Sequence, residues 1–160
     1  MTLGQFSEIG FMLLIPFFFR SIGIKKVMII AMFAWAVRYL FFAYGSVDTI
    51  SLIYLGILIH GICYDFFFVA GQIYVDQNAP KELKSSAQGL LTQATYGVGM
   101  FIGTWLSGRV VHYYAGNTKE YWQPTWIFPA IIAIIVMVLF TLLFKDTNKK
   151  TVNRDREVTV

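Results

Sequence analysis

Residues 126–144 read WIFPAIIAIIVMVLFTLLF, a run without a single Asp, Glu, Lys or Arg. A helix needs about 20 consecutive apolar residues to cross the hydrocarbon core of a bilayer, which is roughly 30 Å thick. Four further apolar stretches precede this run, at 2–19, 27–44, 50–74 and 87–111. The sequence therefore predicts an all-α, polytopic transmembrane helical bundle with five spans.

The composition of the 160 residues agrees with a membrane protein and excludes most soluble classes. Hydrophobic residues make up 57% of the chain and charged residues 14%, whereas soluble globular domains carry roughly 25% charged residues. The single cysteine, Cys63, cannot form an internal disulfide. We expect a membrane bundle over 1–144 and a polar tail over 145–160, and no nucleic-acid partner despite the net charge of +4.

The basic residues predict how the chain is oriented in the membrane. Ten of the 13 Lys and Arg residues lie on one predicted side, in the loops 20–26 and 77–84 and in the tail, whereas the loops of the opposite side carry only Lys119. Because basic loops stay in the cytoplasm, the tail should be cytoplasmic. Met1 opens almost directly into an apolar helix, unlike a signal peptide. We therefore expect a truncated chain or a misassigned start.

Three charged residues lie inside the predicted spans at a similar depth. Glu8, Arg38 and Asp65 are each 11 or 12 residues from the cytoplasmic end of their stretch, which at a rise of about 1.5 Å per residue is about 17–18 Å. Ionisable groups at this depth cost several kcal/mol and usually mark a functional site. Secondary transporters place their substrate and coupling-ion sites near this midplane.

Neighbouring polar residues extend this candidate site. Gln5 lies three residues before Glu8, and His60 lies four residues before Tyr64, so each pair shares a helix face. The sequence leaves open whether His60 is a functional group or a core histidine that has found its hydrogen bonds. Small residues on the fourth span at 99, 103 and 107 indicate a helix-packing stripe.

The pairing of the remaining two charges also stays open. Arg38 and Asp65 lie at matching depths on neighbouring antiparallel spans, so they either form a structural ion pair or take part in proton coupling. The sequence contains no metal-ligand cluster, nucleophilic triad or phosphate-binding loop, so we expect neither a metal site nor an enzyme.

Several short motifs occur together in one order and spacing. They are QFSE at 5–8, GIKKVM at 23–28, FAWAVR at 33–38, DFF at 65–67 and SAQGL at 86–90. In this combination the chain resembles the nucleoside:proton symporter family of the major facilitator superfamily. The resemblance covers nearly the whole chain and matches the last five of that family's twelve helices.

The resemblance implies a bacterial inner-membrane, multi-pass carrier that takes up nucleosides with protons by alternating access. Gln5 and Glu8 would contact the nucleoside, His60 and Tyr64 would add aromatic contacts, and Asp65 would be linked to proton coupling. Aromatic rings with Gln and carboxylate acceptors suit a flat base and a hydroxylated ribose. The N-terminal bundle of the same carrier would be the missing partner.

The sequence does not decide between Glu8 and Asp65 as the carrier of the proton. Burial disfavours the ionised form of a carboxyl group, and a nearby cation such as Arg38 favours that form. The only cofactor expected is the coupling proton itself. Two alternatives remain: a major facilitator carrier for another small polar solute such as a sugar, or a non-transporting membrane subunit.

Overall fold

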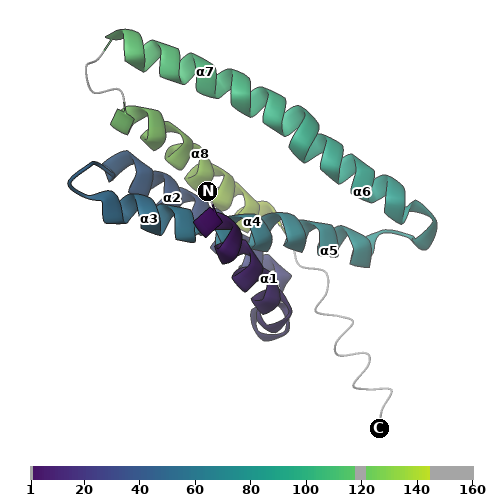
Figure 1. Ribbon diagram of the computed structural model, residues 1–160. Coiled ribbons are helices and arrows are strands. Elements are labelled where there is room, and N and C mark those ends of the chain that lie inside the picture. Colours follow the sequence, from purple (N-terminus) through teal and green to yellow (C-terminus); the bar gives the residue numbers. More distant parts are fainter. Residues whose placement is uncertain (1, 118–121, 145–160) are drawn as a thin grey trace.

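The computed structural model describes residues 2–117 and 122–144, and every regular element in these two segments is a helix (Figure 1). The predicted tail at 145–160 lies outside the described residues. The helices join end to end into five rods. These are α1 (Thr2–Ile22); α2 (Ile24–Tyr44); rod III, made of α3 (Ile50–Leu58), α4 (His60–Tyr64), η1 (Asp65–Val69) and α5 (Ala70–Asn78); rod IV, made of η2 (Lys81–Leu83), α6 (Lys84–Thr92), η3 (Gln93–Gly99) and α7 (Met100–Asn117); and α8 (Trp122–Leu143).

The five predicted helical stretches are confirmed as helices, and three of them meet the requirement for a membrane span by length and composition. These three are α2, rod III and α8, while α1 contains a shorter apolar segment, Gly4–Phe19. The predicted loop at 112–123 is too long, because α7 continues to Asn117. Its aromatic residues Tyr113 and Tyr114 suit a membrane interface and need no loop to reach it.

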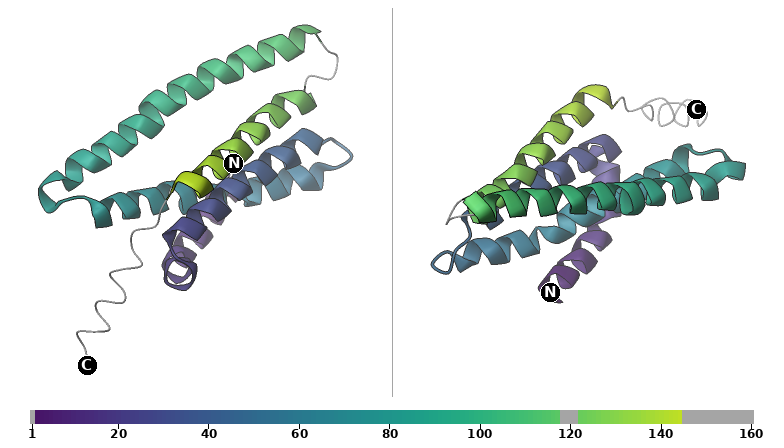
Figure 2. Two further views of the ribbon diagram at one scale, coloured as in Figure 1. Left: turned by 180° about the vertical axis from the view of Figure 1, so that it is seen from behind. Right: turned by 90° about the horizontal axis from the view of Figure 1, so that it is seen from above.

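Helix α2 lies at the centre of the bundle, because small residues let its neighbours approach closely. Ala31, Ala34, Ala36 and Ala43 are all buried, and α2 contacts α1, rod III and α8. Between membrane helices, association depends on such close packing rather than on the hydrophobic effect. The two views in Figure 2 show α2 between α8 and rod III.

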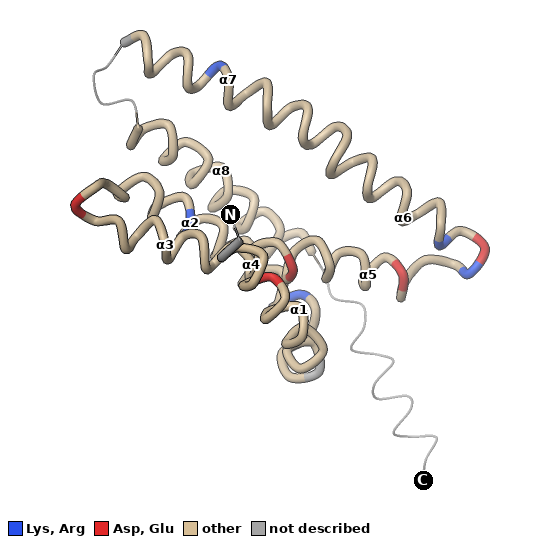
Figure 3. Tube along the Cα trace, in the orientation of Figure 1, with Lys and Arg blue, Asp and Glu red and all other residues tan. Residues whose placement is uncertain are grey.

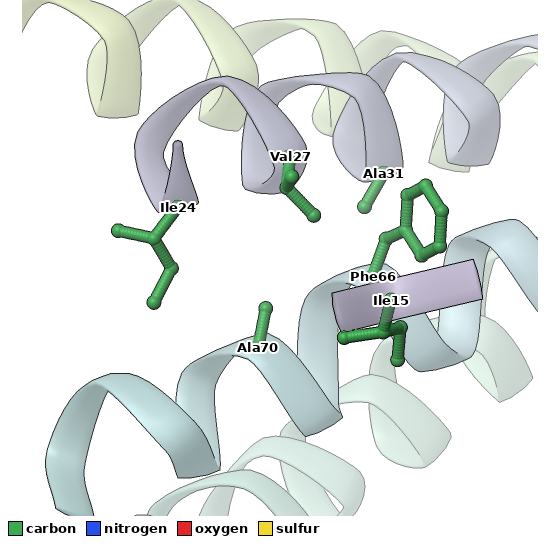
Figure 4. Packing of buried hydrophobic residues seen from close by; sticks show 6 residues of the cluster. All are labelled: Ile15, Ile24, Val27, Ala31, Phe66 and Ala70. Atoms are coloured by element: carbon green, nitrogen blue, oxygen red, sulfur yellow. The ribbon is translucent and has the colours of Figure 1, made fainter. Parts of the chain in front are cut away.

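One apolar cluster fixes the crossing of α1, α2 and rod III. Figure 4 shows side chains of these three rods pointing toward one another. Phe66 adds ring contacts to Phe11 and Phe18 of α1, with centroids 6.1 Å and 5.1 Å apart. The buried members of the cluster are Ile15, Ile24, Val27, Ala31, Phe66 and Ala70.

Rod IV lies at the edge of the bundle, apart from α1 and α2 (Figures 1 and 2). It packs against α5 near its beginning and against α8 near its end. None of the residues in α6 and η3 is buried. Within the described segments, rod IV is therefore the part of the bundle least covered by its neighbours.

Polar contacts fasten the ends of the rods. Nζ of Lys25 donates to the carbonyl oxygens of Thr141 and Phe144, at 3.1 Å and 2.5 Å, and so caps the last turn of α8. Nε1 of Trp122 donates to the carbonyl oxygen of Phe42 at 2.8 Å. A basic side chain at a helix carboxyl end satisfies carbonyls that have no partner within the helix.

Candidate functional site

The site begins where α1 crosses rod III at very short range. A Cβ atom added to Gly61 would lie 2.6 Å from Oγ of Ser7 and 2.7 Å from its carbonyl carbon and oxygen. The Ser7 hydroxyl donates to the carbonyl oxygen of Leu58 and accepts from the backbone N–H of Gly61. It thereby bridges the short irregular turn between α3 and α4, and it sets Glu8 beside His60.

A chain of charged and polar contacts runs from this crossing through the bundle. Oε1 of Glu8 lies 3.0 Å from Nε2 of His60, and Nη1 of Arg38 lies 2.7 Å from Nδ1 of the same ring. The Glu8 and His60 side chains are about one-third exposed, at 32% and 28%. Figure 3 shows acidic positions where α1 passes rod III and a basic position on α2. Three of the ionisable groups that were predicted to share a site, Glu8, His60 and Arg38, are thus in contact.

The possible ion pair between Arg38 and Asp65 is not formed, because Arg38 reaches His60 instead. Asp65 is buried, with 4% of its surface exposed, and its Oδ2 has no hydrogen-bond partner. Two residues at the same depth in a membrane can still point in different directions around their helices. Five residues separate His60 from Asp65, which in an α-helix is a rotation of about 140°. The two side chains therefore point to different sides of rod III.

The aromatic part of the site links rod III to rod IV. The hydroxyl groups of Tyr64 and Tyr96 are hydrogen-bonded to each other. Phe68 packs on both rings, with centroid distances of 4.9 Å to Tyr64 and 5.5 Å to Tyr96. The His60 ring lies 5.9 Å from that of Tyr64, so an aromatic row leads away from the charged chain. Gln5, by contrast, is exposed on α1.

Beside this row lies a cavity of about 830 Å³ between α2, η1, α7 and α8. Its lining is mostly apolar and includes Trp35 and Trp126. The small residues Gly99, Gly103 and Ser107 also line it, and a Cβ atom at Gly103 would meet nothing within 4 Å. The predicted packing stripe therefore faces a cavity rather than a neighbouring helix in the part of the chain that is described.

Three residues of the site were missed by the sequence analysis. They are Ser7, which bridges α1 and rod III; Trp35, whose Nε1 donates to the carbonyl oxygen of Cys63 at 3.2 Å; and Tyr96 on η3. The sequence could have indicated two of them, because Ser7 is next to Glu8 and Trp35 lies one turn before Arg38. Tyr96 gave no such signal, since its partner is on another rod.

The arrangement suits recognition of a small polar molecule with a flat face. It offers a carboxylate, an imidazole and a row of aromatic rings where α1 crosses rod III, with a half-buried guanidinium behind them. In 2–117 and 122–144, no three His, Cys, Asp or Glu side chains gather as ligands for a metal ion. The fold and this site define a polytopic helical membrane protein of the transporter class.

Comparison with known proteins places the chain within that class. Residues 1–149 match the sequence profile of the family described as Nucleoside H+ symporter, and the chain belongs to this family. YegT of Escherichia coli (strain K12) is 42% identical over 159 residues, covering 94% of this chain and 37% of YegT. The xanthosine permease of the same organism is 37% identical over 161 residues, covering 99% of this chain and 38% of the permease.

The fold agrees with a solved member of the same group. The crystal structure of the nucleoside transporter NupG superimposes with a TM-score of 0.80 at 34% sequence identity, and the match covers 91% of this chain and 36% of NupG. The prediction of an all-α membrane bundle of the major facilitator type is thereby confirmed. The chain spans little more than a third of the length of these relatives.

Proposed function

We propose that this chain is the C-terminal bundle of a proton-coupled nucleoside carrier, which works by alternating access together with an N-terminal bundle. The observation that carries the proposal is the Glu8–His60 contact at the crossing of α1 and rod III, in a chain of the Nucleoside H+ symporter family. The bundle comprises residues 1–144, and the tail at 145–160 lies in the cytoplasm of a bacterial cell. In such carriers the substrate site lies between the two bundles, so one bundle alone covers only part of it.

Glu8 contacts the nucleoside in this proposal, with Gln5, His60 and Tyr64 as further contacts. The carboxylate accepts hydrogen bonds from ribose hydroxyls, and the aromatic rings stack on the base. Gln5 is exposed on the same helix face as Glu8, so it is available to a solute that lies between the two bundles. The coupling ion is a proton, and the proposal requires no organic cofactor or metal.

The first test removes the charge of Glu8 in the full-length carrier. Glu8→Gln should lower nucleoside accumulation at least about tenfold at equal membrane abundance, because a hydrogen bond to a charged group is worth about 1.5–3 kcal/mol. The matched control is Glu82→Gln, which removes the same charge from an exposed position on η2. Uptake by Glu8→Gln equal to that of Glu82→Gln would reject the assignment.

Asp65 is the proposed site of proton coupling, because it is a buried carboxyl with an oxygen that has no hydrogen-bond partner. A charge in such a place is costly, and alternating exposure to water changes that cost during the transport cycle. Asp65→Asn should abolish accumulation driven by a pH gradient and retain exchange of labelled for unlabelled nucleoside. Asp48→Asn, in the exposed turn after α2, is the control. Full pH-driven accumulation by Asp65→Asn would eliminate Asp65.

Two further experiments separate this proposal from its alternatives. Competition by sugars but not by nucleosides would indicate a carrier for another polar solute. Absence of any solute binding by the full-length protein would indicate a non-transporting subunit. The gene itself offers the simplest check of the architecture: an in-frame upstream extension that encodes seven more spans supports the proposal, and a stop codon with a promoter directly upstream of Met1 contradicts it.

A further inference from the structure

Three side chains from three different rods form one chain of contacts at the centre of the site. Nη1 of Arg38 on α2 lies 2.7 Å from Nδ1 of His60 on α4. Nε2 of the same ring lies 3.0 Å from Oε1 of Glu8 on α1. Both ring nitrogens are therefore occupied, one by a cation and the other by a carboxylate.

The chemistry of the guanidinium decides which ring nitrogen carries the hydrogen. A guanidinium has only donors and stays protonated in proteins. Nδ1 of His60 must therefore accept from Arg38, and the hydrogen of the neutral ring lies on Nε2, which donates to Glu8. A doubly protonated ring would set two donors against each other at 2.7 Å. The contacts select the neutral ring in a single tautomer.

Arg38 is itself held in place by its surroundings. Its guanidinium carbon lies 5.5 Å from the ring centroid of Trp35 and 5.2 Å from that of Phe42. These residues stand three before and four after Arg38, on the same face of α2. Trp35 is fixed in turn to rod III through the carbonyl oxygen of Cys63. A cation between two rings is stabilised where it lies, so Arg38 offers its donor to His60 from a fixed position.

We propose that Arg38 is a positioning residue of the solute site, which fixes the direction of the Glu8 carboxylate through His60. The imidazole is a hydrogen-bond bridge and does not carry the coupled proton. The inference rests on the proposed function, in which Glu8 contacts the nucleoside. The ionisable groups that face His60 from the described helices are Glu8 of α1, Arg38 of α2 and Tyr64 of its own helix.

Two substitutions of His60 in the full-length carrier, reconstituted in liposomes, separate a bridge from a proton carrier. The amide of His60→Gln accepts from Arg38 with its oxygen and donates to Glu8 with its nitrogen, but it does not titrate. This variant should keep the parental pH dependence of uptake, and its KM should rise less than that of His60→Leu, because it loses the ring contact to the base but keeps the hydrogen-bond bridge. His60→Leu can neither accept from Arg38 nor donate to Glu8. Its KM should rise about tenfold, which corresponds to about 1.4 kcal/mol.

Substitutions of Arg38 test whether it acts through His60. Arg38→Met should raise KM about as much as His60→Leu, and the double variant should be no worse than the poorer single variant, because residues that act through one another are not additive. Arg38→Lys should recover part of the loss, since an ammonium also donates. The double variant also leaves no unpaired buried charge, so it tests the inference even where His60→Leu reaches the membrane poorly.

A spectroscopic measurement keeps this inference separate from the proposed function. In carrier labelled with ¹⁵N-histidine, with His112→Gln to simplify the spectrum, solid-state NMR should show an acceptor Nδ1 and a protonated Nε2 for His60, and Arg38→Met should change this pattern. A protonated Nδ1, additive losses in the double variant, or loss of pH-driven accumulation in His60→Gln would overturn the inference. If Glu8→Gln leaves uptake unchanged, the proposed role of Glu8 in the solute site fails, and the NMR spectrum still decides the Arg38–His60 contact.

Discussion

Replacing Gly61 with alanine should destabilise the bundle at the crossing of α1 and rod III. The new Cβ atom would lie 2.7 Å from backbone atoms of Ser7, whereas ordinary van der Waals contacts begin at 3.4 Å. The backbone of α1 would therefore have to retreat by about 0.7 Å. Overpacking of this kind costs about 1–3 kcal/mol in the free energy of unfolding. Loss of the Ser7 bridge adds about 1 kcal/mol.

Cys63 provides the assay, because its thiol is fully buried two residues from the substitution. A thiol-reactive fluorophore, added to the full-length carrier in detergent during heating, reports when this region opens. The matched control is Gly103→Ala, where the new Cβ meets nothing within 4 Å. Ser7→Ala should not rescue Gly61→Ala, because the clash includes backbone atoms. A midpoint for Gly61→Ala equal to that of Gly103→Ala would refute the reasoning.

Three further predictions concern the contacts that hold the rods together. Lys25→Met removes the cap of α8, so we expect faster amide hydrogen exchange in the last turn of that helix, measured by mass spectrometry, and unchanged exchange in α1. Tyr96→Phe removes the hydrogen bond to Tyr64 and should speed exchange in η3; a rate equal to the parental one would show that the rings alone hold rod IV. Trp122→Phe removes the contact to the carbonyl oxygen of Phe42 and should lower the unfolding free energy by about 1 kcal/mol, measured by denaturant titration.

The five rods could be predicted from the sequence because apolar length alone sets a membrane helix. The common depth of Glu8, Arg38 and Asp65 in the membrane is a prediction from the helical rise of about 1.5 Å per residue. The partner of Arg38 could not be predicted, because it depends on the rotation of each rod about its own axis. The sequence offered Asp65 as the partner of Arg38 and left two roles open for His60, whereas in the structure Arg38 contacts His60.

Contacts between rods that are far apart in the sequence were also beyond prediction. Tyr96 lies on rod IV, and nothing in the neighbouring sequence indicates that it meets Tyr64 on rod III. The close approach at Gly61 depends likewise on where α1 crosses rod III, which the sequence of rod III alone does not specify. The roles of Gln5, Glu8, His60, Tyr64 and Asp65 remain proposals to be tested.

The π-helical turns η1 (Asp65–Val69) and η3 (Gln93–Gly99) have a consequence for insertions and deletions during evolution. A π-helical turn holds one residue more than an α-helical turn, so it absorbs an inserted residue locally. Deleting one residue from 66–69 should therefore leave an ordinary α-helix and preserve the faces that α4 and α5 present. The same deletion elsewhere in rod III would rotate everything beyond it by about 100°. Chain-length differences within the rods of related carriers should accordingly gather at these two turns.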